Sequence, residues 1–387
     1  MPRHLASERS RYLPELTIGR LLKIAEEDRR YISLGPGEPD FPPPRNVVSA
    51  AKKALEKGFT RYSPVEGIEE LRQAAARKLK KENRIDADPK NIIITTSSTE
   101  GLLLSLICTT DAGEGVLLPD PGFLAYKPTV EILDGNPISY PLSEEDNFEV
   151  NIEKLEELII PEKTSAIIIN SPSNPTGAVF SQKTLEELAD FAIEYDILII
   201  SDEAYEKYVY DNASHISIAS LNGLEERVIT LHSFSKSFAL PGFRLGYAHV
   251  PEKLSSVMKR AHVFTTLCAP TPFQHAGIEA LLRTGHYIKK MVSEYDRRRR
   301  FLLKWIKKIG LSCSRPKGAF YAFPNIKQLG MKSQKFSEFI LKNARVVTIP
   351  GTEFGRHGEG YIRLSYATDI KIINEAMERI GKAVKKL

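Results

Sequence analysis

One lysine, Lys236, lies in a serine-rich segment that runs from Ser233 to Arg244. The segment follows an apolar run, residues 228–231, which predicts a buried strand. An amine at the end of a buried strand is partly desolvated, and desolvation favours its neutral, nucleophilic form. The nearby hydroxyls and the guanidinium of Arg244 donate hydrogen bonds of the kind that bind a phosphate. The segment therefore indicates an amine able to form an imine beside a phosphate site, which is what pyridoxal phosphate chemistry requires.

Other short apolar runs are followed by polar residues in the same way. They are residues 92–94, 116–118, 166–169 and 197–200. Because these runs do not alternate with polar residues, they predict strands buried on both faces of a mostly parallel sheet. Helical segments between them, such as residues 185–192, would cover both faces and give an α/β fold. Ligands bind beyond the carboxyl ends of strands in such sheets, so we expect the polar residues to converge on one site.

The length and the C-terminal pattern predict two domains. The chain has 387 residues, more than one core usually holds. Its last third contains shorter strand-like runs and ends in an amphipathic helix from about residue 369, a pattern typical of a smaller α+β domain. The strand-like runs are residues 317–323, 345–349 and 361–366. The predicted divisions are an N-terminal arm with part of the small domain (1–44), a large cofactor-binding domain (45–282) and a small domain (283–387).

Composition excludes several classes of protein. The hydrophobic content of 42% is ordinary for a soluble protein, and a net charge of +5 gives no reason to expect nucleic acid or a membrane as partner. We interpret the basic run at residues 297–300 as a solvated helix face with local ion pairs. The three cysteines and eight histidines lack the spacing of a disulfide framework or a metal site. Without a secretory leader or a membrane-length apolar segment, a cytoplasmic location is expected.

Motifs over nearly the whole chain make this sequence similar to the aspartate aminotransferase family, the class I and II aminotransferases. In order, they are residues 37–41, Tyr62 with Gly67, the Ser98 and Thr99 loop, residues 174–177, residues 202–205, residues 233–244 and Arg363 with the two residues after it. The resemblance implies a pyridoxal phosphate enzyme of fold type I. Such a fold has a large domain with a mostly parallel sheet covered by helices on both faces, and a smaller α+β domain.

The resemblance implies roles for the residues that would do chemistry. Lys236 would hold the cofactor as an imine and then move a proton between the substrate Cα and the cofactor. Asp202 would keep the pyridine nitrogen protonated, so that the ring accepts electrons. An N-cap at a strand-to-helix turn is the other interpretation of Asp202. Tyr205 and Asn174 would hydrogen-bond the phenolate oxygen of the ring.

The resemblance also implies how the rest of the cofactor is held. Phe123 would stack on its ring, although an ordinary core position is the alternative. The phosphate would be bound at a helix start and by the lysine segment. The residues concerned are Ser98, Thr99, Ser233, Ser235 and Arg244. Helix capping is the alternative for Ser98 and Thr99.

Substrate binding and assembly are expected to follow the family as well. Arg363 lies on one face of an alternating strand, and a planar guanidinium suits an α-carboxylate held by two bonds. The backbone of Gly37 and the side chain of Asn174 would assist it. Tyr62 would reach the phosphate of a neighbouring subunit, which implies a homodimer with shared active sites.

The expected activity is transfer of an amino group from an L-amino acid to a 2-oxo acid, with 2-oxoglutarate as the expected acceptor, by a ping-pong mechanism. An aspartate-aminotransferase-like enzyme with a broad donor range is favoured. The alternatives are a lyase or synthase of the same fold, an aromatic, branched-chain, alanine or aminoadipate aminotransferase, and a cofactor-binding regulator. A distal carboxylate would need a second cation, for which the sequence does not rank Arg3, Arg20 and Lys127. Phe41, Phe123 and Tyr126 would instead favour an apolar or aromatic side chain.

Overall fold

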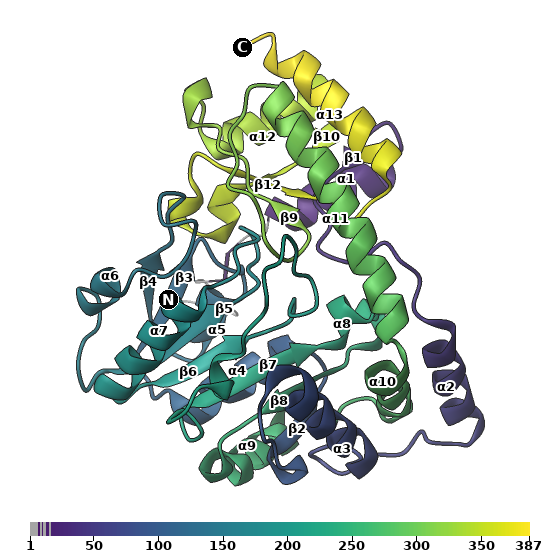
Figure 1. The fold of residues 1–387 in the computed structure, drawn as a ribbon, viewed down its shortest axis with the longest axis vertical. Coiled ribbons are helices and arrows are strands. Elements are labelled where there is room, and N and C mark those ends of the chain that lie inside the picture. The colour runs from purple at the N-terminus through teal and green to yellow at the C-terminus, as the bar shows by residue number, and fades with distance from the viewer. Residues whose placement is uncertain (1–6, 8–9, 11–12, 15–16) are drawn as a thin grey trace, which may run out of the picture.

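The structure is a computed structural model that describes residues 7, 10, 13–14 and 17–387. Figure 1 shows a central sheet with its helices in the lower part of the molecule and a smaller group of helices and strands above it. The long helix α11 (Gly285–Lys308) runs from the lower part into the upper one. Arg3 lies outside the described residues.

A seven-stranded sheet forms the centre of the larger part. In spatial order its strands are β2 (Ile92–Thr95), β8 (Gly246–His249), β7 (Val228–Ser233), β6 (Leu198–Asp202), β5 (Thr164–Asn170), β3 (Gly115–Asp120) and β4 (Asn136–Pro141). Six of these strands run in the same direction, and β8 runs in the opposite direction, antiparallel to both β2 and β7. The five strands predicted from apolar runs are therefore confirmed and end at the same edge. The sequence pattern does not reveal β4 and β8, because β4 contains two prolines and β8 has only two residues, Tyr247 and Ala248, between a glycine and a histidine.

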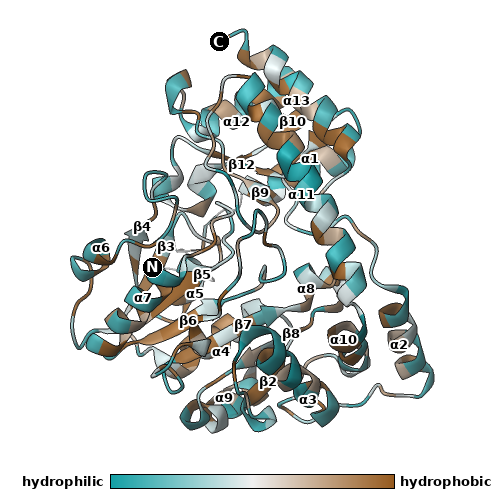
Figure 2. Ribbon diagram, viewed as in Figure 1, coloured by the Kyte–Doolittle hydropathy of each residue, from teal (hydrophilic) through white to brown (hydrophobic). Residues whose placement is uncertain are grey.

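Helices cover both faces of this sheet. They are α2 (Arg45–Glu56), α3 (Glu69–Lys78), α4 (Ser98–Thr109), α5 (Tyr126–Ile132), α6 (Ile152–Glu156), α7 (Gln182–Glu194), α9 (Glu252–Thr265) and α10 (Thr271–Arg283). Neighbouring strand residues point to opposite faces. Thus Ile93 packs in one core with α4, α5 and α9, whereas Ile92 and Ile94 pack in another with α2, α3 and α10. Figure 2 shows that strands β5 and β6 are brown, as expected for strands buried on both sides.

The smaller part combines the C-terminal third with the N-terminal segment. The antiparallel strands β11 (Ile349–Pro350), β12 (Ile362–Ser365) and β9 (Tyr321–Ala322) lie beside α11, α12 (Ser333–Ala344) and α13 (Ile370–Val384). β1 (Ile32–Ser33), which follows α1 (Thr17–Glu27), pairs in parallel with β10 (Val346–Val347). An α+β arrangement is thus present, with strands shorter than the sequence predicts.

The basic run at residues 297–300 is only half solvated. Arg297 and Arg300 are exposed and form local ion pairs, as expected. Arg298 and Arg299 are buried, and the prediction of a wholly solvated face was wrong for them. Arg298 binds Asp40, and Arg299 binds both Asp296 and the distant Asp211. The reason is geometric: a run of four residues covers more than one helical turn of 3.6 residues, so it cannot face water throughout.

Candidate active site

A cavity of about 230 Å³ lies at the carboxyl ends of β2, β5, β6 and β7. Apart from Tyr62, every residue predicted from the sequence to be catalytic, to bind the cofactor or to bind the substrate carboxylate lines it. They are Gly37, Ser98, Thr99, Phe123, Asn174, Asp202, Tyr205, Ser233, Ser235, Lys236, Arg244 and Arg363. Residues far apart in the chain meet here, as the hydrogen bond between Arg363 and Gly35, 328 positions apart, illustrates.

Lys236 lies in α8 (Phe234–Ser237), the single short turn that follows β7. Ser233 caps this turn by accepting a bond from the backbone N–H of Ser235 at 3.2 Å. The Nζ atom of Lys236 is partly buried and donates to the carbonyl oxygen of Gly37 at 2.6 Å. Burial, followed by the positive charge of Arg363, lowers the pKa of the amine to about 8. A substantial fraction of the amine is therefore neutral near physiological pH.

Asp202 ends β6 and is buried beside the cavity. Its Oδ2 accepts a hydrogen bond from the hydroxyl of Tyr126 at 2.8 Å, and its Oδ1 accepts one from the backbone N–H of Ala204 at 3.1 Å. Burial raises its pKa, while these two bonds act in the opposite direction. The contact to Ala204 is a local turn bond of the capping kind. No long helix starts at Asp202, because the next helical element after β6 is the short turn Ile218–Ser220. The sequence treated Tyr126 as a possible pocket wall; instead it is fully buried behind Asp202.

Asn170, the last residue of β5, and Asn174, which follows the strand, form the next wall. Asn170 donates through Nδ2 to the backbone oxygen of Asp202 at 2.9 Å and accepts through Oδ1 from the backbone N–H of Asn174 at 2.8 Å. It thereby ties neighbouring strand ends together. Asn170 was not among the predicted site residues. Its place directly after an apolar run is the signal that could have found it.

Tyr205 faces Tyr321, another residue that the sequence did not single out. Their hydroxyl groups lie 2.8 Å apart, and both rings are buried. The Nζ atom of Lys236 lies 5.9 Å from the centroid of the Tyr205 ring. Burial raises the pKa of the Tyr205 hydroxyl well above its ordinary value, so this group remains a hydrogen-bond donor. The aromatic cluster in residues 317–323 was the only sequence sign of Tyr321.

The start of α4 lines the cavity with Ser97, Ser98 and Thr99. Ser97 is the N-cap, with its Oγ accepting from the backbone N–H of Glu100 at 3.4 Å. Ser98 and Thr99 are therefore the first helical residues, and the interpretation of them as caps was wrong. Their N–H groups belong to the turn in which a helix offers no carbonyl partner. A Cβ atom at Gly246 of β8 would lie 2.7 Å from the Ser98 nitrogen, so glycine permits this close approach.

Arg363 is a buried cation with neutral partners. Nη1 donates to the side-chain oxygen of Asn174 at 2.9 Å and Nη2 to the backbone oxygen of Gly35 at 2.7 Å. The guanidinium carbon lies 4.4 Å from the centroid of the Tyr321 ring and 4.7 Å from that of Phe354. Its buried Nε atom has no hydrogen-bond partner, and no carboxylate among the described residues pairs with it. A buried guanidinium in this state is suited to an anion.

Apolar side chains form the remaining wall. Ile18 and Leu22 of α1 line the cavity together with Phe123 and Leu124. Phe41 does not line it; its ring packs edge-on against Tyr295 at 5.4 Å. The prediction of Phe41 and Tyr126 as pocket walls was therefore wrong. Both carry aromatic rings whose placement depends on distant residues.

The lining cations among the described residues are Lys236, Arg244 and Arg363. Arg20 is exposed on α1 and does not line the cavity. Lys127 lines a neighbouring cavity, and its Nζ atom lies 3.8 Å from Oε1 of Glu131.

Tyr62 is 82% exposed and lies outside the cavity of its own chain. That exposure leaves its hydroxyl available to another molecule.

These donors fit pyridoxal phosphate. An amine, a buried carboxylate and two asparagine side chains line the cavity and are groups that a substituted pyridine needs. The start of helix α4, two serine hydroxyls and Arg244 also line it, and such groups could donate hydrogen bonds to a phosphate. The unpartnered Nε of Arg363 offers a separate anion site.

Known proteins resemble the chain over nearly its full length. The family model for aminotransferase class I and II matches residues 29–380. Aromatic-amino-acid aminotransferase 2 of Thermococcus litoralis is 45% identical over 98% of both chains, and an aspartate aminotransferase of Pyrococcus abyssi is 45% identical over 95% of both. Among solved structures, the aromatic aminotransferase of Pyrococcus horikoshii superposes with a TM-score of 0.90 at 45% identity, covering 96% of this chain and 99% of that one. The aspartate aminotransferase of Thermus thermophilus with maleate gives 0.94 at 32% identity, covering 98% and 100%.

Proposed function

The chain belongs to the aminotransferase class I and II family, and from this premise we propose roles for the residues of its cavity. It is a pyridoxal phosphate-dependent transaminase of the aspartate-aminotransferase-like kind, which moves an amino group from an amino acid to a 2-oxo acid. The observation that carries the proposed site is the partly buried, weakly basic amine of Lys236, which shares one cavity with Asp202 and Arg363.

The cofactor, when bound, supplies an aldehyde that captures an amine and a ring that withdraws electrons from the substrate Cα. The chain's own residues bind and orient. Asp202 would hold a protonated ring nitrogen, and Tyr126 would keep its carboxylate turned toward the cavity. Tyr205 and Asn174 would donate hydrogen bonds to the ring oxygen. Phe123 would cover one ring face, and the start of α4 with Ser235 and Arg244 would bind the phosphate.

Lys236 would act as the proton carrier at the substrate Cα. A general base works best when its pKa lies near the working pH, and the pKa of this amine is lowered to about 8. The positive charge of Arg363 contributes to that lowering. Since Arg363 also offers its free Nε to an anion, a substrate α-carboxylate bound there would lie close to the amine that takes the proton.

We propose that large apolar or aromatic amino acids are good donors. Each of the three lining cations among the described residues already has a proposed role, so none of these three remains for a distal carboxylate. The remaining wall, Ile18, Leu22 and Leu124 with Phe123, gives apolar contact. The relatives named as aromatic aminotransferases are in keeping with this donor class, while those named as aspartate aminotransferases keep aspartate as the competing donor.

A homodimer is proposed from the exposure of Tyr62, which would complete the phosphate site of a second copy.

The proposed domain bounds remain residues 1–44 for the arm, 45–282 for the large domain and 283–387 for the small domain. Among the described residues, no helix is both long and apolar enough to cross a bilayer. A cytoplasmic location is proposed on the low cysteine content of the sequence.

A donor panel tests the activity and the donor class together. Purified protein with pyridoxal phosphate is given phenylalanine, leucine, alanine or aspartate with 2-oxoglutarate, and glutamate, the 2-oxo acid of the donor and ammonia are measured. We expect glutamate and the donor's 2-oxo acid in equal amounts, with kcat/KM highest for phenylalanine. Ammonia release without glutamate would favour a lyase, and a preference for aspartate would contradict the apolar wall.

The Leu22→Ala variant localises the donor preference. It is expected to lower kcat/KM for phenylalanine about tenfold, since about 1.4 kcal/mol of apolar contact is lost, and to leave alanine nearly unchanged. Leu282→Ala, at a leucine that is 50% exposed and outside the cavity, is the matched control.

A further inference from the structure

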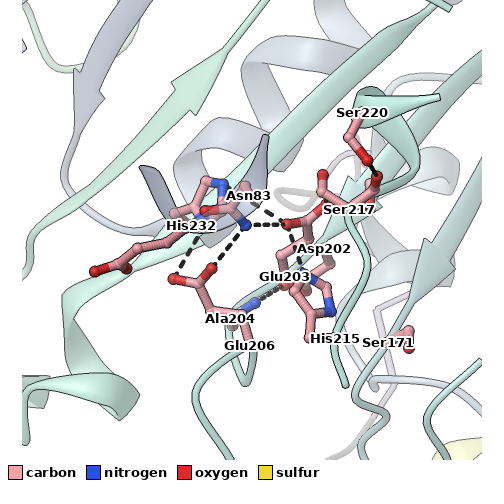
Figure 3. Close-up of polar contacts among 12 residues, drawn as sticks. Asn83, Ser171, Asp202, Glu203, Ala204, Glu206, His215, Ser217, Ser220 and His232 are labelled. Carbon is pink, nitrogen blue, oxygen red and sulfur yellow. Dashed lines mark hydrogen bonds and ion pairs between the residues drawn. The ribbon is translucent and has the colours of Figure 1, made fainter. Parts of the chain in front are cut away.

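The turn that carries Asp202 and Tyr205 also carries two carboxylates that do not line the cavity. Glu203 and Glu206 alternate with those residues along the chain and point into the core behind them (Figure 3). Glu203 is 1% exposed and Glu206 is 8% exposed. We call the residues that gather around these two carboxylates the ionic cluster. Its members are Lys78, Asn83, Glu203, Glu206, His215 and His232.

Glu203 is held by donors from its own strand and from the loop that follows β6. Its Oε1 accepts from the hydroxyl of Ser217 at 2.5 Å and from that of Ser201 at 3.1 Å. Its Oε2 lies 2.9 Å from Nε2 of His215. Burial would raise the pKa of Glu203, yet the charge of His215 and its hydrogen bond hold the pKa at about 2. The carboxylate is therefore ionised.

Glu206 is held from α3 and from the π-helical turn that follows it (Leu79–Asn83). Its Oε1 pairs with the ammonium group of Lys78, and Lys207 lies 3.9 Å from the same oxygen. Nδ2 of Asn83 donates to Glu206 at 2.9 Å and to Glu203 at 3.3 Å, so it bridges the two carboxylates. Lys78 in turn donates to Oδ1 of Asn83 at 2.8 Å.

His232 connects the cluster to the neighbouring strand β7. Its ring nitrogens lie 3.9 Å from Glu203 and 3.7 Å from Glu206, and its ring stacks on Tyr247 with centroids 4.7 Å apart. The next residue, Ser233, lines the cavity and caps the turn that holds Lys236. The cluster therefore contacts the end of β6, which carries Asp202, and the end of β7, which leads into the turn that carries Lys236.

Stability alone does not account for such an arrangement. Buried ion pairs often contribute no more than apolar side chains of the same volume. Donor atoms of Glu203, Glu206 and His215 lie within 4.8 Å of one another, a spacing that a cation could use. However, the ammonium group of Lys78 and the amide of Asn83 already direct their hydrogens at these carboxylates. What the cluster does achieve is a fixed orientation of the turn at residues 202–206, which is not followed directly by a helix or strand.

We propose that the ionic cluster positions residues 202–206 and the end of β7, and so sets where Asp202 and Tyr205 stand relative to Lys236. Its members are positioning residues that act from behind the cavity. The inference rests on the roles proposed above for Asp202, Tyr205 and Lys236. Loosening the cluster should disturb the binding and the electronic environment of the cofactor more than it disturbs folding.

The test compares His215→Leu and Lys78→Met with the wild-type protein. Three quantities are measured: the thermal midpoint, the Kd for pyridoxal phosphate, and the pH midpoint of the visible absorbance of the loaded protein. We expect Kd to rise about tenfold or more, the effect that supporting shells have at metal sites, and the absorbance midpoint to shift. His215→Gln keeps a donor to Glu203 and should restore most of the affinity.

Arg299→Met is the matched control, because Arg299 is fully buried in an ion pair and does not line the cavity. It should lower the thermal midpoint without changing Kd or the absorbance midpoint. The proposal is overturned if His215→Leu and Lys78→Met lower only the thermal midpoint, as the control does. Should Lys78→Met fail to fold, His215→Leu decides, since His215 lies in a partly exposed loop. A wild-type protein that binds no pyridoxal phosphate would instead refute the proposed site.

Discussion

At the scale of single residues, the cavity derives its chemistry from groups whose surroundings change their ordinary properties. Lys236 is a weaker base than a lysine in water because it is buried beside Arg363. Asp202 is buried too, and burial raises its pKa, but it retains two hydrogen bonds that favour the ionised form. Arg363 keeps a free Nε in the interior. Each of these buried groups can therefore bind a ligand without water competing for its hydrogen bonds.

The amine of Lys236 should titrate near pH 8. Between pH 6 and 10, the rate at which the cofactor-free protein captures an aldehyde should rise and level off above about pH 8, because only the neutral amine reacts. Arg363→Gln removes a positive charge that lowers this pKa, so its midpoint should move upward. Stopped-flow absorbance measures both profiles. A wild-type midpoint near 10 would contradict the effect of burial.

The lowered pKa of Lys236 should also make the free energy of unfolding depend on pH. Its folded-state pKa of about 8 lies below the ordinary value of 10.5, so between these values the unfolded chain binds more protons than the folded one. This group alone therefore makes stability increase with pH across that window. Denaturant unfolding of the cofactor-free protein at pH 8 and 9.5, compared with Lys236→Met, isolates the contribution. A variant with the same pH dependence as wild type would refute it.

Tyr126→Phe should weaken the anchoring of Asp202. The variant removes the hydroxyl that donates to Oδ2 at 2.8 Å. A hydrogen bond to a charged group contributes about 1.5–3 kcal/mol, so we expect kcat to fall roughly tenfold or more and cofactor release to quicken. Tyr140→Phe is the matched control, because that buried hydroxyl donates to the carbonyl of Ile168 and lies outside the cavity. Equal losses in the two variants would mean that Asp202 does not need Tyr126.

At the scale of elements, the site depends on where strands end and where one helix begins. β6 and β7 are parallel neighbours, so Asp202 pairs with Leu231 and the turn holding Lys236 starts three residues later. The antiparallel strand β8 brings Gly246 against the first turn of α4. The ionic cluster then ties the ends of β6 and β7 to α3. Regular pairing thus sets the spacing between amine, carboxylate and phosphate donors.

Gly246→Ala should damage the phosphate end of the cavity. A Cβ atom there would lie 2.6 Å from the carbonyl carbon of Ser97 and 2.7 Å from the nitrogen of Ser98, so the helix start must shift. We expect about a tenfold rise in Kd for pyridoxal phosphate, which corresponds to ~1.4 kcal/mol. Equilibrium fluorescence titration measures it. Gly285→Ala, where no atom lies within 4 Å, should leave Kd unchanged.

At the scale of the whole molecule, the site combines the central sheet with the smaller part. Arg363 comes from β12 and binds Asn174, which follows β5. Asp40, three residues after Gly37, binds Arg298 of α11. Ile18 and Leu22 complete the cavity from α1. Binding therefore depends on the relative placement of segments from both ends of the chain.

Tyr62 should act across a dimer. If its hydroxyl reaches the phosphate of a second copy, Tyr62→Phe and Tyr62→Ala should raise Kd for the cofactor equally, by about tenfold for one charge-assisted bond. Mixing Tyr62→Ala with Lys236→Ala should then yield some dimers with one intact site. Sedimentation establishes the dimer, and cofactor binding to the mixture counts the intact sites. A monomer, or no gain on mixing, would exclude the shared site.

The sequence alone was enough to predict the α/β fold and most of the polar residues that meet in the cavity, although not Asn170 or Tyr321. Uninterrupted apolar runs are buried wherever they occur, and polar residues directly after them must lie at a sheet edge, so Asp202, Asn174 and Lys236 could be placed together. The order of these motifs along the chain was specific enough to indicate the family.

Only the tertiary structure decided which side chains touch. Tyr126 is separated from Asp202 by 76 residues and Tyr205 from Tyr321 by 116, and hydrophobic periodicity shows that a residue is buried without showing its partner. The same reason applies to Arg298 and Arg299, whose carboxylate partners Asp40 and Asp211 are distant in sequence. The ionic cluster joins α3, β6, β7 and a loop, and its charges would look like ordinary surface residues until the chain folds around them.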